Sequence, residues 1–180
     1  MSPINIPGVI LLSANRVWRT YPGGKTLDKL ECKTTTEDSH FAEDWIASTT
    51  RAVNKGREAF DQEGYSKVEA NGEWYLLKEL MQEYPGEILG DTHFKKYGAN
   101  TQFLLKFLDS VIRLHIQAHP TIAFSQKYLN SNFGKTEAYV ILDIREEVSE
   151  PYIHLGFQHP PAVDDFRQAV LVSCQSEIVG

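Results

Sequence analysis

Hydrophobic and polar positions change their period along this chain. Four apolar residues in the middle recur three or four positions apart, namely Leu77, Leu80, Met81 and Tyr84. This spacing is typical of one face of an amphipathic helix, and it predicts a helix over residues 71–84 that ends at Pro85-Gly86. A second short helix is expected at 91–97, and the residues before the first helix show no strict alternation. We therefore expect a helical insert over about residues 40–98.

The C-terminal half is patterned differently. Short runs rich in β-branched, aromatic and other apolar residues, each bounded by turn residues, occupy 103–108, 111–119, 136–144 and 152–157. A helix is expected after them, at 163–172. Strands around a helical insert predict a mainly β fold, either a β-sandwich or a barrel. A hydrophobic content of 42% over 180 residues suits one domain across 1–180.

Composition narrows the classes of partner. The net charge of −6 argues against a general nucleic-acid binder, and no apolar run reaches the roughly 18 residues of a membrane span. No Lys or Arg precedes the apolar stretch Val9–Leu12, so we expect no secretory signal and predict a cytoplasmic protein. Cys32 and Cys174 are interpreted as reduced thiols. An anionic substrate would need a local cluster of positive charge or a metal.

One predicted strand carries an unusual row of polar residues. In an extended chain His115, Gln117 and His119 share one face, and the residues between them are apolar. Pro120 disfavours a helical conformation at His119, which favours the extended interpretation. Burying three polar side chains in a row costs free energy unless they gain partners, and a metal ion would satisfy two of them at once.

A carboxylate opens the next predicted strand. Glu137 could lie beside Gln117 and His119 if the two strands pair, and imidazole, amide and carboxylate donors together suit zinc, manganese or iron(II). A solvated sheet face with scattered polar residues is the alternative, and spacing alone leaves both open. Lys135 shares the side of Glu137. Its Gly-Lys-Thr context is not a nucleotide-binding loop, because Leu129 stands where that loop needs glycine.

Six segments, taken in order, resemble the signature of the type I phosphomannose isomerases of the cupin superfamily, over roughly residues 15–160. They are Asn15-Arg16-Val17-Trp18-Arg19-Thr20-Tyr21 followed by Gly23-Gly24, Glu43-Asp44-Trp45-Ile46-Ala47-Ser48, Leu104-Leu105-Lys106-Phe107-Leu108-Asp109, Ile116-Gln117-Ala118-His119-Pro120, Gly134-Lys135-Thr136-Glu137-Ala138-Tyr139 and Gly156-Phe157.

The resemblance implies a cupin jelly-roll that interconverts mannose 6-phosphate and fructose 6-phosphate through an enediol(ate). By the same carry-over, Gln117, His119 and Glu137 are zinc ligands, with one zinc ion expected per chain. Lys135 is the implied catalytic and substrate-binding lysine, and His115 is expected to contact the substrate. The implied partner is a small sugar phosphate, with no nucleic acid and no membrane.

The chain also departs from the family pattern. The family's fourth ligand, a histidine in a Gly-x-Pro-His-Ala-like segment, has no match before Gly180, and neither has the second cupin half. Three explanations stay open. The chain is the N-terminal portion of a longer protein; it completes its site with His115, His154 or a second subunit of a homodimer; or it binds metal or sugar phosphate without turnover.

Overall fold

The computed structural model describes residue 4 and residues 6–176, with side chains described as far as residue 173. The chain forms two compact units, Met1–His115 and Ile116–Gly180. None of the helices in the described part of the chain is both long and apolar enough to cross a membrane.

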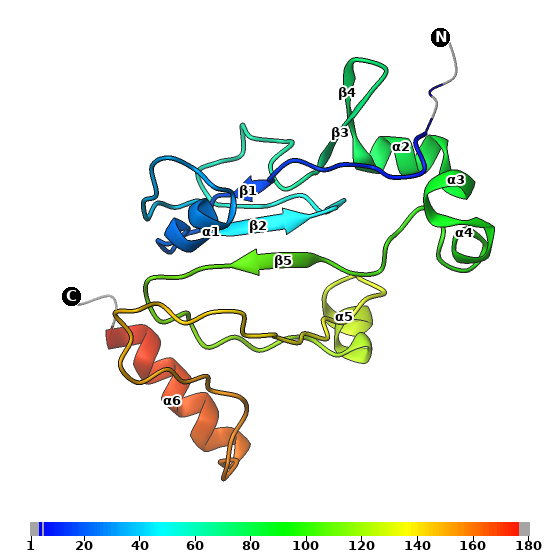
Figure 1. The fold of residues 1–180 in the computed structure, drawn as a ribbon. Helices are drawn as coiled ribbons and strands as arrows, with labels where there is room; N and C mark the ends of the chain where they lie inside the picture. Colours follow the sequence, from blue (N-terminus) through cyan, green and yellow to red (C-terminus); the bar gives the residue numbers. More distant parts are fainter. Residues whose placement is uncertain (1–3, 5, 177–180) are drawn as a thin grey trace. The chain divides into compact units, whose positions relative to one another are not determined.

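An antiparallel sheet organises the first unit (Figure 1). Its strands are β1 (Arg16–Val17), β2 (Glu43–Ile46) and β5 (Leu105–Leu108), in the order β1-β2-β5. The registers place Glu43 opposite both Val17 and Leu108, and Trp45 opposite Lys106. Because side chains alternate along a strand, these residues share one face of the sheet. Val17 and Trp45 are buried there and pack with Ala52 and Leu104.

A β-hairpin follows, formed by β3 (Lys67–Ala70) and β4 (Glu73–Leu76). The connecting residues Asn71 and Gly72 both have positive φ, at 53° and 79°. This is the conformation that a two-residue hairpin turn requires, and Asn-Gly adopts it readily. The predicted helix at 71–84 is therefore wrong over its first six residues. Trp74 is 59% exposed on β4.

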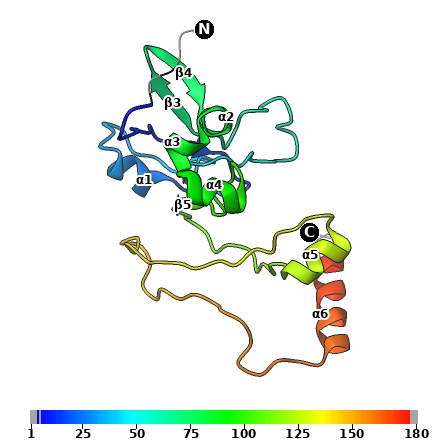
Figure 2. The same ribbon diagram turned by 90° about the vertical axis from the view of Figure 1, so that its right-hand side faces the viewer.

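Helices complete the first unit (Figure 2). They are α1 (Lys25–Leu30), α2 (Leu77–Glu83), α3 (Pro85–Leu89) and α4 (Asp91–Tyr97). Leu77, Leu80 and Met81 of α2 are buried and pack with Val68 of the hairpin. The periodicity thus predicted the core face of α2 correctly, and it also predicted the bounds of α4.

The second unit contains α5 (Ile122–Tyr128) and α6 (Val163–Ser176). Residues 129–162 between them form no helix or strand (Figure 2). Apolar side chains along this connection are exposed, with Val140 at 82% and Leu155 at 94%. The helix predicted at 163–172 is confirmed as part of α6.

The predicted fold class, a mainly β cupin jelly-roll sandwich, is wrong. The described residues form five short strands, divided between a three-stranded sheet and a hairpin, together with six helices. Of the strands predicted in the C-terminal half, only the one at 103–108 is observed, as β5. Within the described chain, no strand forms at the other three predicted positions, residues 111–119, 136–144 and 152–157. The expected helical insert also contains three strands, β2, β3 and β4.

Candidate metal centre

A short helical loop brings two segments of the second unit together. Thr121 caps α5 by accepting a hydrogen bond from the Phe124 backbone N–H, and the chain returns so that the Lys135 N–H donates to the Pro120 carbonyl at 3.0 Å. Gly134 makes this return possible. A Cβ at that position would lie 2.9 Å from both the Pro120 oxygen and the Ile122 nitrogen, which leaves no room for any side chain.

Three polar side chains converge where these segments meet. His119 Nε2 and Glu137 Oε2 are in direct contact. Lys135 Nζ lies 2.8 Å from Glu137 Oε2 and 3.2 Å from His119 Nε2. On the other carboxylate oxygen, the Tyr139 hydroxyl donates a hydrogen bond to Glu137 Oε1 at 2.5 Å. Residues 135, 137 and 139 therefore lie on one side of the chain, as expected for an extended segment.

The surroundings of Glu137 keep it ionised. Burial by itself raises the pKa of this carboxyl, but hydrogen bonds from Lys135 and Tyr139 and the positive charges of Lys135 and His119 outweigh it and lower the pKa to about 2. The glutamate is therefore an anionic oxygen donor at neutral pH, which is the form that binds a metal ion.

Two of the converging groups are of types that bind divalent metal ions, an imidazole nitrogen and a carboxylate oxygen, and they lie in contact. The Lys135 ammonium group lies beside both, and its positive charge opposes a metal ion at that point. The part of the chain that the structure describes contains no group of three or more His, Cys, Asp or Glu side chains able to hold a metal. A third protein ligand would have to be of another type, and Gln117, two positions before His119, carries an amide oxygen.

The remaining predicted residues lie elsewhere. His115 is exposed and ends the first unit. His154 packs edge-on against Tyr152, with ring centroids 5.0 Å apart. Gln117 is exposed, beside Ile116 and Ala118, which are also exposed. Of the predicted site residues, the structure brings together His119, Lys135 and Glu137. That His119, Glu137 and Gln117 hold a metal stays a prediction, and so does the catalytic and substrate-binding role of Lys135.

Sequence reasoning gave no role to Tyr139. Its hydroxyl orients the Glu137 carboxylate from the side opposite to Lys135. The signal was available, because in an extended chain the second residue after a ligand lies on the ligand's side.

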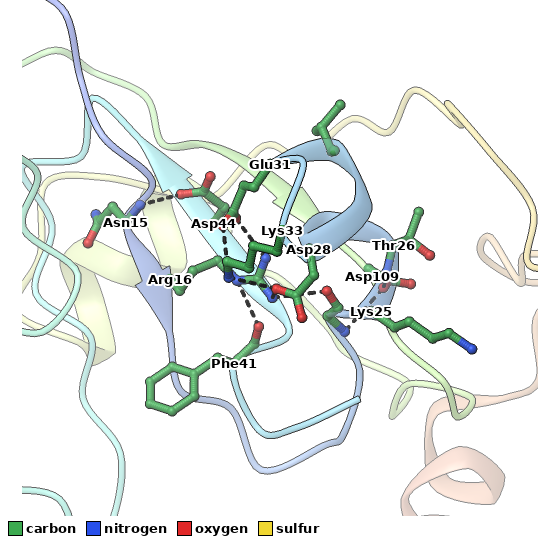
Figure 3. Close-up of polar contacts among 12 residues, drawn as sticks. Asn15, Arg16, Lys25, Thr26, Asp28, Glu31, Lys33, Phe41, Asp44 and Asp109 are labelled. Carbon is green, nitrogen blue, oxygen red and sulfur yellow. Dashed lines mark hydrogen bonds and ion pairs between the residues drawn. The ribbon is translucent and has the colours of Figure 1, made fainter. Parts of the chain in front are cut away.

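In the first unit, the opening motif builds a structural network (Figure 3). Arg16 forms ion pairs with Asp28 at 3.3 Å and Glu31 at 2.8 Å, and it donates to the carbonyls of Gly24 and Phe41. Arg16 of β1 thus links this strand to both ends of α1 and to the segment that carries Phe41.

Asp109 fixes the start of α1. Its Oδ2 accepts hydrogen bonds from the backbone N–H groups of Gly24 and Thr26, at 3.1 and 2.7 Å. These are among the orphan donors of a helix N-terminus, and they attract a carboxylate. Asp109 follows β5, so this contact ties two segments that are far apart in sequence (Figure 3).

Glu43 belongs to the second signature segment and is the centre of a buried polar network. It lies on β2 and is only 1% exposed. The Tyr21 hydroxyl donates to its Oε1, Trp45 Nε1 donates to Oε2 at 2.7 Å, and Lys106 Nζ lies 3.1 Å from Oε1. Burial raises the pKa of Glu43, but these donors and the charges of Lys106 and Arg19 lower it below its ordinary value.

Comparison with known proteins gives a distant likeness. Over 94 residues the chain is 28% identical to a protein of Bacillus subtilis (strain 168) named "Probable mannose-6-phosphate isomerase GmuF". The match covers 52% of this chain and 27% of that relative, so the chain spans about a quarter of the relative's length. No family model and no solved structure matches the chain. The comparison supports a distant relationship to a sugar isomerase.

Proposed function

We propose that this chain carries the metal-binding part of an aldose–ketose isomerase that interconverts mannose 6-phosphate and fructose 6-phosphate. The observation that carries the proposal is the convergence of His119, Lys135 and Glu137, three residues from two signature segments, at one point. The name of the distant relative agrees with it.

His119 and Glu137 would hold a zinc ion, with Gln117 as a third ligand. A bound divalent metal polarises the oxygens of a hydroxy-carbonyl substrate and stabilises the negative charge that develops on them. Tyr139 would keep the Glu137 carboxylate in one orientation through its 2.5 Å hydrogen bond, leaving Oε2 directed at His119.

Lys135 is the chain's own candidate for acting on the substrate. Its side chain is half exposed while its Nζ lies within 3.2 Å of both His119 and Glu137. Its ammonium group would donate a hydrogen bond to a substrate oxygen bound beside His119 and Glu137. An ammonium group at that position would favour the enediolate over the neutral sugar.

Zinc content and turnover test the proposal together. The purified 180-residue chain is expected to contain close to one zinc ion, and Glu137→Gln and His119→Ala are each expected to lose it. Glutamine keeps the size of Glu137 but removes the negative charge, so the loss would report on metal binding rather than on packing. Elemental analysis measures the metal, and a coupled assay with mannose 6-phosphate measures isomerisation.

His154→Ala is the matched control, because it removes a histidine of the same unit whose ring packs edge-on against Tyr152. It is expected to keep its zinc. Full isomerase activity in Glu137→Gln or His119→Ala would contradict the proposal.

A second candidate function is binding of metal or sugar phosphate without turnover. It is favoured by the absence of a third His, Cys, Asp or Glu side chain near His119 and Glu137 within the described residues. In that case zinc would raise the melting temperature of the protein by linkage, and no isomerisation would be detected.

A further inference from the structure

An exposed indole lies on the hairpin of the first unit (Figure 1). Trp74 of β4 is opposite Glu69, and more than half of its side chain is open to solvent. The other two tryptophans have partners, since Trp45 is buried and Trp18 stacks on His40. Among the described residues, no ring-stacking or cation–π contact involves Trp74. Its large apolar ring is therefore available to a ligand.

Trp74 lines two hollows. The smaller has a volume of about 180 Å³, and its lining combines the indole with three polar side chains, a tyrosine and a buried leucine, namely Gln62, Lys67, Trp74, Tyr75, Leu76 and Glu79. The larger has a volume of about 470 Å³ and lies between the extended segment 9–13 and the hairpin turn at 71–72. The smaller hollow suits one ring of a small molecule, and Trp74 borders the space beyond it.

The three polar side chains of the smaller hollow come from different parts of the unit. Lys67 of β3 pairs with Leu76, so it shares the sheet face of Trp74 because side chains alternate along a strand. Glu79 belongs to α2, and Gln62 precedes the hairpin. Within the described chain, the side chains of these three residues form no hydrogen bond or ion pair. Their donors and acceptors are thus free to bind a ligand.

The charges of the hollow indicate the kind of ligand. The Lys67 ammonium group and the Glu79 carboxylate are opposite in sign, so together they add no net charge. An anion would meet Glu79 and a cation would meet Lys67, whereas a neutral molecule with several hydroxyl groups can satisfy both. A hydroxyl group both donates and accepts, and the Gln62 amide does the same.

We propose that the smaller hollow beside Trp74 binds a neutral sugar ring. A pyranose has a face of C–H groups that packs on an indole, and a rim of hydroxyl groups for the amide, ammonium and carboxylate groups around it. Ligand sites in general combine an apolar surface with a few polar groups that fix orientation. The site belongs to the first unit and uses neither the candidate metal centre nor a phosphate group.

Sugar titration tests the proposal. D-Mannose, D-glucose and the disaccharide mannobiose are each titrated into the full 180-residue chain, and heat of binding and tryptophan fluorescence are measured. Binding is expected to shift the emission to shorter wavelength, because the sugar removes water from Trp74. Trp74→Ala is expected to weaken binding about tenfold or more, through loss of the stacked ring and its buried area. Trp74→Phe keeps a ring and is expected to retain part of the affinity.

Gln62→Ala is a second variant, so that a folding defect in Trp74→Ala leaves the proposal testable. It removes one hydrogen-bonding group and is expected to weaken binding about threefold to tenfold. Phe103→Ala is the matched control, because Phe103 is an exposed aromatic residue of the same unit that lines neither hollow. Its affinity is expected to stay within about twofold of the parent chain.

Absence of binding of all three sugars, or binding that Trp74→Ala and Gln62→Ala leave unchanged, would overturn the proposal. Tighter binding of mannobiose than of mannose, weakened in Trp74→Ala, assigns the site to a ring within an oligosaccharide. Equal affinities assign it to a free sugar. Glu137→Gln is expected to leave every titration unchanged, which distinguishes this site from the candidate metal centre and holds whether or not the chain is an isomerase.

Discussion

Replacement of Glu43 by alanine is expected to destabilise the first unit by about 3–5 kcal/mol, the usual cost of removing one partner from a buried ion pair. Its carboxylate is 1% exposed and interacts with Tyr21, Trp45 and Lys106. Without it, the Trp45 indole N–H and the Lys106 ammonium group would lose their buried acceptor, and the cavity left behind would add to the cost.

Because of the Glu43 carboxylate, we expect the stability of the first unit to depend on pH. The pKa of Glu43 is lower in the folded chain than its ordinary value of 4.5, so the folded state favours the ionised form. The stability that it contributes is fully present above the unfolded pKa and is lost as the pH falls through the folded pKa. The free energy of unfolding of the first unit is therefore expected to fall below about pH 4.5. In Glu43→Gln it is expected to fall less steeply with pH.

Urea unfolding followed by tryptophan fluorescence measures both effects, because all three tryptophans of the chain belong to the first unit. Glu69→Ala is the control, since Glu69 is an exposed carboxylate on β3, and its effect is expected to stay within about 0.5 kcal/mol. A loss for Glu43→Ala as small as that of Glu69→Ala would mean that the buried network contributes nothing to stability.

The fold was predictable where the sequence signal is local. The spacing of Leu77, Leu80 and Met81 predicted the buried face of α2, and the short helix α4 was also found. The hairpin before α2 was missed although its signal is equally local. Asn71-Gly72 is a strong turn signal, but the apolar residues that follow it fit a helical period as well, and we extended the helix through them.

Strand pairing was not predictable, because it depends on a partner distant in sequence. The run at 136–144 has the composition of a strand, with Val140, Ile141 and Leu142 in succession. A strand is defined by the ladder it joins, and no described segment pairs with this run. Composition alone could not supply that information.

The candidate metal centre was predictable in part. Spacing placed Glu137 near His119 through two paired strands, whereas the structure brings them together through the loop that contains α5. The motifs predicted that Glu137 and His119 lie close together, but they did not predict that a loop containing a helix brings them there. The network around Glu43 could not be foreseen, since its members, Tyr21 and Lys106, are 85 residues apart and meet only in the sheet.

Gly134→Ala is expected to weaken zinc binding about 10- to 100-fold, the range typical of losing groups that orient a metal ligand without being ligands themselves. The added Cβ would lie 2.9 Å from backbone atoms of Pro120 and Ile122, and backbone cannot move aside as a side chain can. The return of the chain after α5 would have to open, and Glu137 would move away from His119. Equilibrium dialysis or competition with a zinc chelator measures the affinity.

Gly8→Ala is the matched control, because a Cβ at Gly8 would meet nothing within 4 Å. It is expected to leave zinc affinity unchanged. The two variants keep every proposed ligand, so they separate the geometry of the site from its composition. If Gly134→Ala binds zinc as tightly as the parent chain, the approach of the two segments is not what assembles the centre. His119 and Glu137 would then have to reach a metal through a different arrangement of the second unit.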